Sequence, residues 1–287
     1  MDLCNLSVIK SVMADAGITF RKEFGQNFLT NRMIPEDIAD SCADTSERMI
    51  LEIGPGIGCL TKELALRYKK VVAVEIDKGL IPVLAKTLDE FDNITVINDD
   101  IMKVDIPKLI EEYSEGMPVS VCANLPYYIT TPILMHLLES GVKFSTITVM
   151  VQNEVAQRLA AKEGSSDYGA ITAVLGYYGN VRKLFKVSAG CFVPAPKVDS
   201  AVVRIDLHPA PVFDLKNEKL FFDLIKAAFE MRRKTLQNAI SAKFPQYSKE
   251  LISEAILSVT SDEKIRGERL STADFAALSN YLADKCI

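Results

Sequence analysis

Short apolar runs alternate with helical patterns along the first 160 residues of the chain. The apolar runs are MILEI (49–53), VVAVEI (71–76), NITVIN (93–98), VSVCAN (119–124) and STITVMV (145–151). Most of them lead into segments whose apolar residues recur at helical spacing, namely CLTKELALRY, GLIPVLAKTLDE, TPILMHLLES and QNEVAQRLAAK. Continuous apolar strands that alternate with helices are typical of a parallel sheet covered on both faces.

The pattern changes twice after residue 178. Residues 179–207 hold two extended runs around a proline-rich loop, which predict an antiparallel pair at the edge of the sheet. After HPAPV the pattern is wholly helical, in KLFFDLIKAAFEMRRKTLQNAI, YSKELISEAILSV and TADFAALSNYLADK. Because prolines stand at 209 and 211, we predict an α/β domain over residues 1–210 and a small all-helical domain over 211–287.

The composition predicts a globular cytoplasmic protein without a metal. The chain has 287 residues, 48% hydrophobic and 25% charged, and no apolar run approaches the roughly 20 residues of a membrane helix. The N-terminus lacks the pattern of a secretory signal. Six cysteines occur singly, without a C-x-x-C pair, which favours a reducing compartment. Only His136 and His208 are available for a histidine metal site or a Ser-His-Asp triad.

The charge is unevenly distributed along the chain. The net charge is −5, but residues 141–245 hold 15 Lys and Arg against 9 Asp and Glu, a local charge of +6, so the remainder carries −11. One interpretation is a solvated basic face. The other is a surface for a polyanion beside an otherwise acidic domain.

Three consecutive strand ends carry residues suited to a cofactor. LEIGPGIGCLT places Gly54, Gly56 and Gly58 after the first strand, where backbone can approach a ligand and a helix begins. Glu75 ends the second strand and could accept hydrogen bonds from two ribose hydroxyls, and Asp99-Asp100 ends the third. In parallel sheets these ends face one crevice. The alternative is that the glycines only turn the chain and Glu75 is solvated.

Two cofactor classes fit this pattern, NAD(P) and S-adenosylmethionine. The spacing G-x-G-x-G, with Cys59 next, departs from the dinucleotide fingerprint G-x-G-x-x-G. The Tyr-x-x-x-Lys spacing of some nicotinamide enzymes occurs only at Tyr281 and Lys285, in the helical tail. S-adenosylmethionine is therefore favoured.

The fourth strand ends in an unusual turn, Asn124-Leu125-Pro126-Tyr127. The Asn124 side-chain oxygen and a backbone carbonyl near Leu125 could accept hydrogen bonds from an exocyclic amine of a nucleobase and stabilise charge that develops on it. Pro126 fixes the carbonyl, and Tyr127 offers a face for a flipped-out base. The alternative is an ordinary strand-to-helix turn with an Asn cap. Cys122 lies within the strand, so we expect a buried residue rather than the nucleophile of a cytosine methyltransferase.

Six ordered blocks resemble the ribosomal RNA adenine N6,N6-dimethyltransferase family, and most closely its bacterial small-subunit (16S) branch. They are FRKEFGQNFLTN, LEIGPGIGCLT, NLPYYITTPI, MVQNEVAQRLAAKEGSSDYGAIT, FVPAPKVDSAVV and FEMRRKTLQNAI. The resemblance covers about Phe20 to Ile240. It implies a Rossmann-like class I methyltransferase sheet, mostly parallel with an antiparallel edge pair, and a C-terminal all-helical domain that binds RNA or the ribosome.

The resemblance also implies roles for particular residues. Those that contact S-adenosylmethionine would be Asn27, Leu29, Gly54, Glu75, Asp100 and Asn124, and the glycine pattern adds Gly56 to them. Phe192 would pack the target adenine opposite Tyr127, although by its sequence alone it could equally be a core residue. The basic residues that would contact phosphates are Arg182, Lys183, Lys197, Arg232, Arg233 and Lys234.

The resemblance implies N6,N6-dimethylation of two adjacent adenosines near the 3′ end of small-subunit rRNA, and the residues at the strand ends are compatible with that chemistry. The expected partner is the rRNA or a pre-30S particle, with no membrane and no metal, and the protein is expected to be a monomer. One alternative is a large-subunit rRNA methylase that confers antibiotic resistance. Another is a non-catalytic ribosome-assembly factor on a methyltransferase fold.

Overall fold

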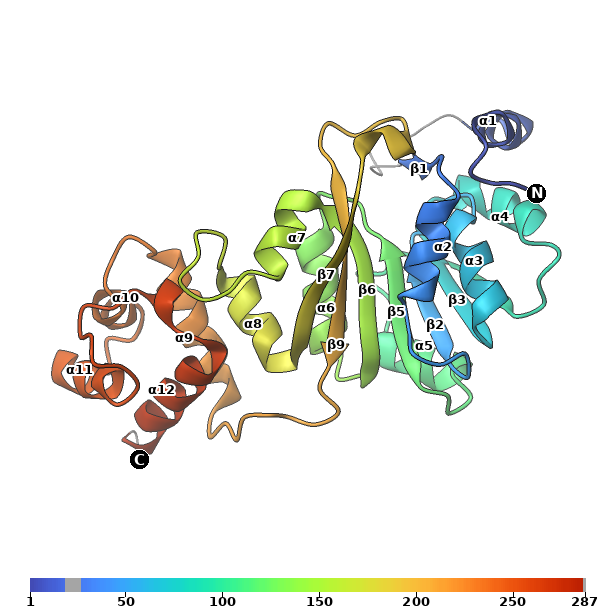
Figure 1. The fold of residues 1–287 in the computed structure, drawn as a ribbon. Coiled ribbons are helices and arrows are strands. Elements are labelled where there is room, and N and C mark those ends of the chain that lie inside the picture. The colour runs from blue at the N-terminus through green and yellow to red at the C-terminus, as the bar shows by residue number, and fades with distance from the viewer. Residues whose placement is uncertain (19–26, 286–287) are drawn as a thin grey trace. The chain divides into compact units, whose positions relative to one another are not determined.

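A mixed seven-stranded sheet forms the centre of the computed structural model, which describes residues 1–18 and 27–285 (Figure 1). The strand order is β4-β3-β2-β5-β6-β9-β7. The strands are β2 (Met49–Ile53), β3 (Lys70–Glu75), β4 (Ile94–Asn98), β5 (Val119–Asn124), β6 (Phe144–Gln152), β7 (Gly179–Val187) and β9 (Ser200–Leu207). The five strands from β4 to β6 are parallel, and β9 is antiparallel to β6. The predicted sheet, with its antiparallel edge, is confirmed.

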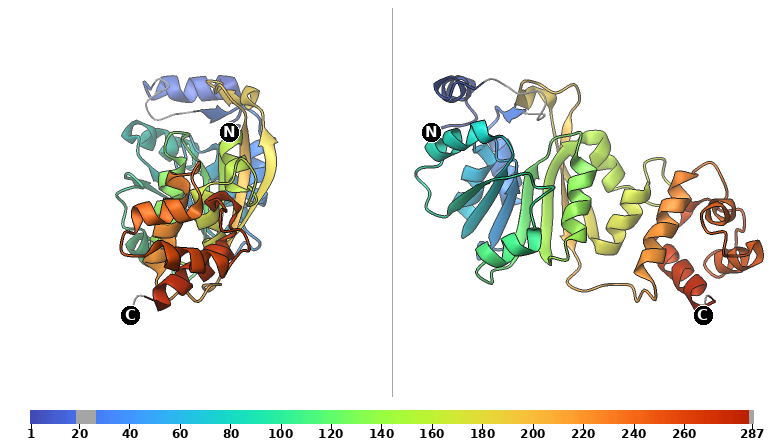
Figure 2. Two further views of the ribbon diagram at one scale, coloured as in Figure 1. Left: turned by 90° about the vertical axis from the view of Figure 1, so that its left-hand side faces the viewer. Right: turned by 180° about the vertical axis from the view of Figure 1, so that it is seen from behind.

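Helices cover both faces of this sheet. In sequence order they are α2 (Met33–Asp40), α3 (Cys59–Arg67), α4 (Ile81–Thr87), α5 (Ile106–Tyr113), α6 (Thr130–Glu139) and α7 (Asn153–Leu159). Helix α1 (Leu6–Asp15) lies beyond one end of the strands (Figure 1). Figure 1 shows α2 and α3 in front of the strands, and the rear view in Figure 2 shows α6 over the opposite face. Because both faces are covered, strand β2 is buried along its whole length.

The strand order positions the crevice that the sequence predicted. The chain moves from β2 outward to β3 and β4, then returns across the sheet to β5 and β6. The carboxyl ends of β2 and β5 therefore diverge into connections on opposite faces of the sheet, which is the point where open α/β sheets bind ligands. A separate two-stranded sheet, β1 (Phe28–Leu29) with β8 (Phe192–Val193), pairs Leu29 with Phe192.

The remaining helices belong to a second compact unit. Residues 157–181 and 210–287 form this unit, and residues 1–156 and 182–209 form the first. Its helices are α8 (Ala170–Tyr178), α9 (Glu218–Glu230), α10 (Leu236–Lys243), α11 (Lys249–Leu257) and α12 (Thr272–Asp284). Phe221 and Phe275 are fully buried in it, and the ring of Phe275 lies 6.3 Å from that of Phe229.

The second unit differs from the sequence analysis in two respects. The expected division at 210/211 left residues 157–181 with the α/β domain, whereas α8 packs against α9 and α12. Because AITAVLGYY is almost uniformly apolar, it has no periodicity that identifies a helix or its partners. The continuous helical pattern over 219–240 is two helices, because α9 ends at Glu230 and Thr235 caps the start of α10 by accepting a hydrogen bond from the Asn238 amide.

Candidate active site

A crevice opens at the carboxyl ends of β2, β3 and β5. The segments that line it are 27–29, Glu52, 54–57, 75–76 and 124–127, with Cys59, Leu60 and Leu80. The structure therefore brings together most of the residues that the sequence analysis selected. Of its proposed catalytic and cofactor residues, only Asp100 and Phe192 do not line this crevice.

The glycine loop after β2 has a backbone that side chains disfavour. Gly54 and Gly56 have φ angles of 69° and 62°, in the left-handed region. A Cβ atom on Gly56 would also lie 3.1 Å from Cε1 of Phe28, tighter than an ordinary contact. The Gly54, Gly56 and Gly58 amides donate to the Val74 carbonyl, to Glu75 Oε2 and to the Pro55 carbonyl. The chain then enters α3 at Cys59, where the N–H groups of the first turn have no acceptor within the helix. This loop, which we call the glycine cradle, lines the crevice, and its contact with the cofactor stays a prediction.

Glu75 lies against this loop at the end of β3. Its Oε2 accepts a hydrogen bond of 3.1 Å from the Gly56 amide, and its Oε1 accepts one of 2.8 Å from the Asp77 amide. Burial raises the pKa of the Glu75 carboxyl, and the two amide hydrogen bonds oppose that shift. The side chain is 4% exposed, so Glu75 is not a solvated surface carboxylate.

The turn after β5 leaves two acceptors at the crevice. Asn124 Nδ2 donates to the carbonyl oxygen of Asn27 at 3.5 Å, which orients the side-chain amide. Among the described residues, neither Asn124 Oδ1 nor the Leu125 carbonyl oxygen accepts a hydrogen bond. The carbonyl of Pro126, by contrast, accepts from the Ile129 amide and the Thr130 hydroxyl. The free pair corresponds to the two acceptors that the sequence analysis expected.

The aromatic residues at and near this turn differ in their exposure and in their contacts. Tyr127 lines the crevice, and its hydroxyl lies 2.6 Å from Ser200 Oγ. Burial raises the pKa of the Tyr127 phenol. Tyr128, the next residue, is 65% exposed. Phe192 is 5% exposed and packs in an apolar cluster with Leu29, so its position opposite the target base stays a prediction.

Two other predicted cofactor residues differ in their surroundings. Leu29 lines the crevice from β1, as do Asn27 and Phe28, and the contacts of Asn27 and Leu29 with the cofactor stay predictions. Residues 20–26 of the same block lie outside the described residues. Asp100 lies in the turn after β4, where its Oδ1 accepts a hydrogen bond of 3.0 Å from the Met102 amide. Its contact with the cofactor stays a prediction.

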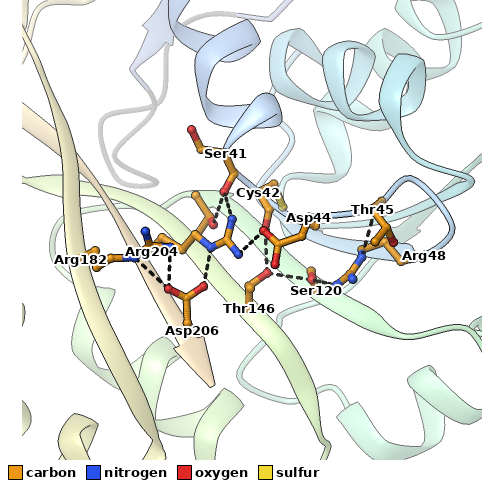
Figure 3. A network of polar contacts seen from close by, with 12 residues as sticks. Ser41, Cys42, Asp44, Thr45, Arg48, Ser120, Thr146, Arg182, Arg204 and Asp206 are labelled. Carbon is orange, nitrogen blue, oxygen red and sulfur yellow. Dashed lines mark hydrogen bonds and ion pairs between the residues drawn. The ribbon is translucent and has the colours of Figure 1, made fainter. Parts of the chain in front are cut away.

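All six predicted RNA-binding residues are exposed, but three of them have a partner within the protein and three have none among the described residues. Arg182 pairs with Asp206, which also holds Arg204 within the network in Figure 3, so Arg182 already has a structural partner. Lys183 donates to Asn153 Oδ1 at 2.7 Å. Arg232 donates to the carbonyls of Ser166 and Tyr168. The exposed side chains without an ion pair or hydrogen bond among the described residues are Lys197, Arg233 and Lys234.

Arg204, part of the basic segment in the sequence analysis, is a structural residue. Its side chain is 9% exposed, and Nη2 lies 2.6 Å from Asp44 Oδ1. Nη1 donates to the Ser41 carbonyl at 3.1 Å (Figure 3). This arginine joins β9 to the segment after α2 and is not free to contact phosphate.

Sequence reasoning missed two residues near the crevice. Glu52 lines it from β2, and Ser200 contacts Tyr127 from β9. A charged residue inside the apolar run MILEI was a signal for the first. A single serine at the start of SAVVRIDL carried no comparable signal, because small hydroxyl residues are common in strands.

In the part of the chain that the structure describes, no group of three or more His, Cys, Asp or Glu could hold a metal ion. No helix there is long and apolar enough to span a membrane.

Comparisons with known proteins identify a family and similar structures for this chain. The family model described as ribosomal RNA adenine dimethylase matches residues 17–284. A ribosomal RNA small subunit methyltransferase A of Lachnoclostridium phytofermentans is 48% identical over 269 residues, 93% of this chain and 92% of that protein. A dimethyladenosine transferase from Plasmodium falciparum has a similar structure, with a TM-score of 0.74, 26% identity, and coverage of 87% of this chain and 95% of that one. The 23S rRNA methyltransferase ErmE gives a TM-score of 0.70 at 25% identity, covering 89% of this chain and 99% of that one.

Proposed function

The chain belongs to the ribosomal RNA adenine dimethylase family, and on this premise we propose that it dimethylates N6 of two adjacent adenosines near the 3′ end of small-subunit rRNA. The methyl donor is S-adenosylmethionine. The substrate is the rRNA within a pre-30S particle in the cytoplasm, and the enzyme acts as a monomer. A relative named as a small-subunit rRNA methyltransferase, 48% identical to this chain, supports the choice of substrate.

The residues of the crevice fit this cofactor. At Gly54 no atom lies within 4 Å of the position of a Cβ, so a ligand can approach the backbone there, and the Glu75 carboxylate can accept from two vicinal hydroxyls of a ribose. Glu52 adds a buried carboxylate oxygen without a hydrogen-bond partner among the described residues. When bound, S-adenosylmethionine supplies an electrophilic methyl group carried on a sulfonium.

One observation carries the proposal for an amine substrate, namely the free acceptor pair on the turn after β5. Asn124 Oδ1 and the Leu125 carbonyl can each accept one N–H of an adenine amino group. Both acceptors also stabilise the positive charge that develops on the nitrogen during transfer, because they are fixed before reaction. The Asn27 carbonyl holds the Asn124 amide in the required orientation.

The same turn can hold the base. Tyr127 presents a half-buried ring at the crevice, and an extruded base can stack on such a ring. No strong general base is required, since the amino group becomes acidic only as it gains the methyl group. The chain therefore contributes mainly position and electrostatic stabilisation.

The helical unit and the basic side chains extend the proposal to RNA binding. Lys197, Arg233 and Lys234 are exposed and available for phosphates, and such contacts set register without reading sequence. We assign residues 211–287, together with the segment 157–181 that packs with them, to binding of the RNA or the ribosomal particle.

Transfer of labelled methyl groups to three substrates tests the proposal. The substrates are small ribosomal subunits that lack the modification, large subunits, and duplex DNA. We expect label only on small subunits, recovered as N6,N6-dimethyladenosine, and transfer at least about a hundredfold slower with Asn124→Ala. Label on large subunits would instead favour a role like that of ErmE, which is less similar to this chain than the small-subunit relative. Cofactor binding without transfer to any substrate would favour a non-catalytic assembly factor.

A further inference from the structure

Two cysteine thiols meet beside the glycine cradle, although they come from distant parts of the sequence. Cys59 Sγ, at the start of α3, donates a hydrogen bond of 2.9 Å to the carbonyl oxygen of Leu3, 56 positions earlier in the chain. The thiol of the next residue, Cys4, is hydrogen-bonded to the Cys59 thiol. Both cysteines are free thiols, and the proposed transfer step uses neither of them.

This pair is open to a small molecule. Cys4 and Cys59 line one cavity of about 300 Å³, and Cys59, which is partly exposed, also lines the cofactor crevice. The thiols of Cys42 and Cys122 contact each other as well, but both residues are fully buried in the core. Among the described cysteines, the Cys4–Cys59 pair therefore combines thiol contact with access to a cavity, the arrangement of a redox-reactive pair.

The two thiols differ in acidity. The hydrogen bond from Cys59 lowers the pKa of the Cys4 thiol, although burial and the carboxylates of Asp2, Glu63 and Glu36 oppose that shift. The hydrogen bond to Cys4, together with burial, raises the pKa of the Cys59 thiol. Cys4 is therefore the sulfur that becomes a thiolate, which is the nucleophilic form, and Cys59 keeps its proton.

We propose that Cys4 and Cys59 form a redox modification site, at which a hydroperoxide converts the two thiols into a disulfide beside the cofactor crevice. The Cys4 thiolate attacks one peroxide oxygen, the O–O bond breaks, and the other oxygen takes up a proton and leaves as water or an alcohol. The resulting Cys4 sulfenic acid is attacked by the Cys59 sulfur, and its hydroxyl leaves as water with the Cys59 proton. The two thiols lose two electrons in total, and the hydroperoxide gains them.

The disulfide acts on the crevice through the first turn of α3. The two sulfur atoms must approach to a bond of about 2.05 Å, and Cys59 loses the S–H group that it donates to the Leu3 carbonyl. Cys59 directly follows the glycine cradle, and α1, which begins soon after Cys4, packs with Phe28 and Ile57 of the crevice wall. Because close-packed interiors transmit such shifts, we expect the oxidised protein to bind the cofactor at least about fivefold more weakly. This effect rests on the proposed function, because it takes S-adenosylmethionine as the ligand.

Peptide mapping of the peroxide-treated protein tests the site. The reduced protein is treated with an equimolar amount of hydrogen peroxide, the remaining thiols are alkylated, and the digest is analysed by mass spectrometry without reduction. We expect a cross-linked peptide pair that contains Cys4 and Cys59, and a loss of two of the six thiols. Dithiothreitol should restore both thiols, which distinguishes the disulfide from methionine sulfoxide, a product that dithiothreitol leaves oxidised.

Single substitutions assign the two chemical steps. Cys59→Ser removes the sulfur that closes the disulfide, so the Cys4 sulfenic acid should persist and react with dimedone. Cys4→Ser removes the nucleophile, so neither a disulfide nor a dimedone adduct at Cys59 should form. Cys191→Ser is the control, because Cys191 is also partly exposed but lies in the turn before β8, and the cross-link should form as in the native protein.

Calorimetry with S-adenosylhomocysteine, the product of methyl transfer, measures the effect on the crevice. Peroxide should weaken binding to the native protein about fivefold or more, and dithiothreitol should restore it. Cys4→Ser should bind equally well before and after peroxide, because Cys4 does not line the crevice. By linkage, S-adenosylhomocysteine should make the disulfide easier to reduce in a glutathione buffer by the same factor.

The outcomes separate this inference from the proposed function. A disulfide between other cysteines, or no loss of thiols, overturns the redox site. A Cys4–Cys59 disulfide with unchanged affinity for S-adenosylhomocysteine overturns its effect on the crevice. Failure of the reduced protein to bind S-adenosylhomocysteine overturns the cofactor assignment instead, and the peptide map still decides whether the thiol pair is reactive.

Discussion

The hydroxyl oxygens of Tyr127 and Ser200 lie 2.6 Å apart, within hydrogen-bond distance, although the two residues are 73 positions apart in the chain. Ser200 is fully buried at the start of β9, opposite Gln152 of β6. The antiparallel edge of the sheet therefore holds the ring on which we expect the target adenine to stack. Ser200 is a positioning residue in this arrangement, because it reaches the base only through Tyr127.

Removing this hydrogen bond should slow transfer without changing cofactor affinity. We expect Ser200→Ala and Tyr127→Phe each to lower kcat by about threefold to tenfold, because a buried hydrogen bond contributes roughly 1 kcal/mol. Together they should lower it no further than one alone, since both remove the same contact. Ser120→Ala, which removes another buried hydroxyl far along β5, should reduce stability and leave kcat unchanged. Additive effects on kcat would contradict the positioning role.

Asn124→Ala should reduce methyl transfer by about a hundredfold to a thousandfold, the usual effect of removing one stabilising group at a developing charge. Cofactor affinity should stay within about tenfold, because the lost oxygen faces the amine. Single-turnover kinetics and calorimetry measure the two quantities separately. Normal turnover in this variant would show that the turn does not hold the amine.

Glu75→Ala should weaken cofactor binding, the quantity that Asn124→Ala should leave nearly unchanged. Its carboxylate faces the glycine cradle, so we expect calorimetry to show at least about a tenfold loss of cofactor affinity, from the charged hydrogen bonds to ribose. Unchanged affinity would mean that the ribose lies elsewhere in the crevice.

Gly56→Ala should weaken cofactor binding by a steric route. The new Cβ, at a φ of 62°, would press on the Phe28 ring and displace the strand that lines the crevice. Gly116→Ala is a matched control, because its φ is 77° but no atom lies within 4 Å of the added Cβ. Both variants should lose about 1 kcal/mol of unfolding free energy. Only the first should lose cofactor affinity, and equal losses in both would exclude the steric explanation.

The ligand-free protein should become less stable as the pH rises from about 5 to 8. Folding raises the pKa of Glu52 to about 8, so in this window the folded state binds more protons than the unfolded state. Stability then falls by up to about 1.4 kcal/mol per pH unit. Thermal unfolding measured across this range should show a smaller slope for Glu52→Gln than for the native protein. Identical slopes would indicate that Glu52 is ionised before the cofactor binds.

The exposed lysine and arginine side chains lead to a prediction about RNA binding. Changing Arg233 and Lys234 to Ala should raise KM for small ribosomal subunits and reduce its salt dependence, with kcat unchanged. Arg232→Ala is expected to lower the stability of the helical unit instead, because Arg232 holds the carbonyls of Ser166 and Tyr168. Salt titrations of KM, with unfolding curves for each variant, distinguish these roles. An unchanged KM for the double variant would remove this surface from the proposed RNA contacts.

The sequence by itself determined the strands, the polar residues that end them, and the family. Apolar runs bounded by Gly54, Glu75 and Asn124 mark strand ends, because a buried strand must stop where polar groups return to a cleft. Such patterns extend over a few residues, and they can be recognised without knowing which distant segments pack around them. The same reasoning therefore located most of the crevice.

Only the tertiary structure decided which distant side chains meet. Ser200 reaches Tyr127, Arg204 is held by Asp44, and α8 packs with the C-terminal helices, through contacts between segments widely separated in sequence. Burial likewise made Glu52 a neutral acid and gave Arg182 a structural partner, and neither follows from residue type. Pairing and desolvation depend on everything that surrounds a group, and a linear pattern does not contain that environment.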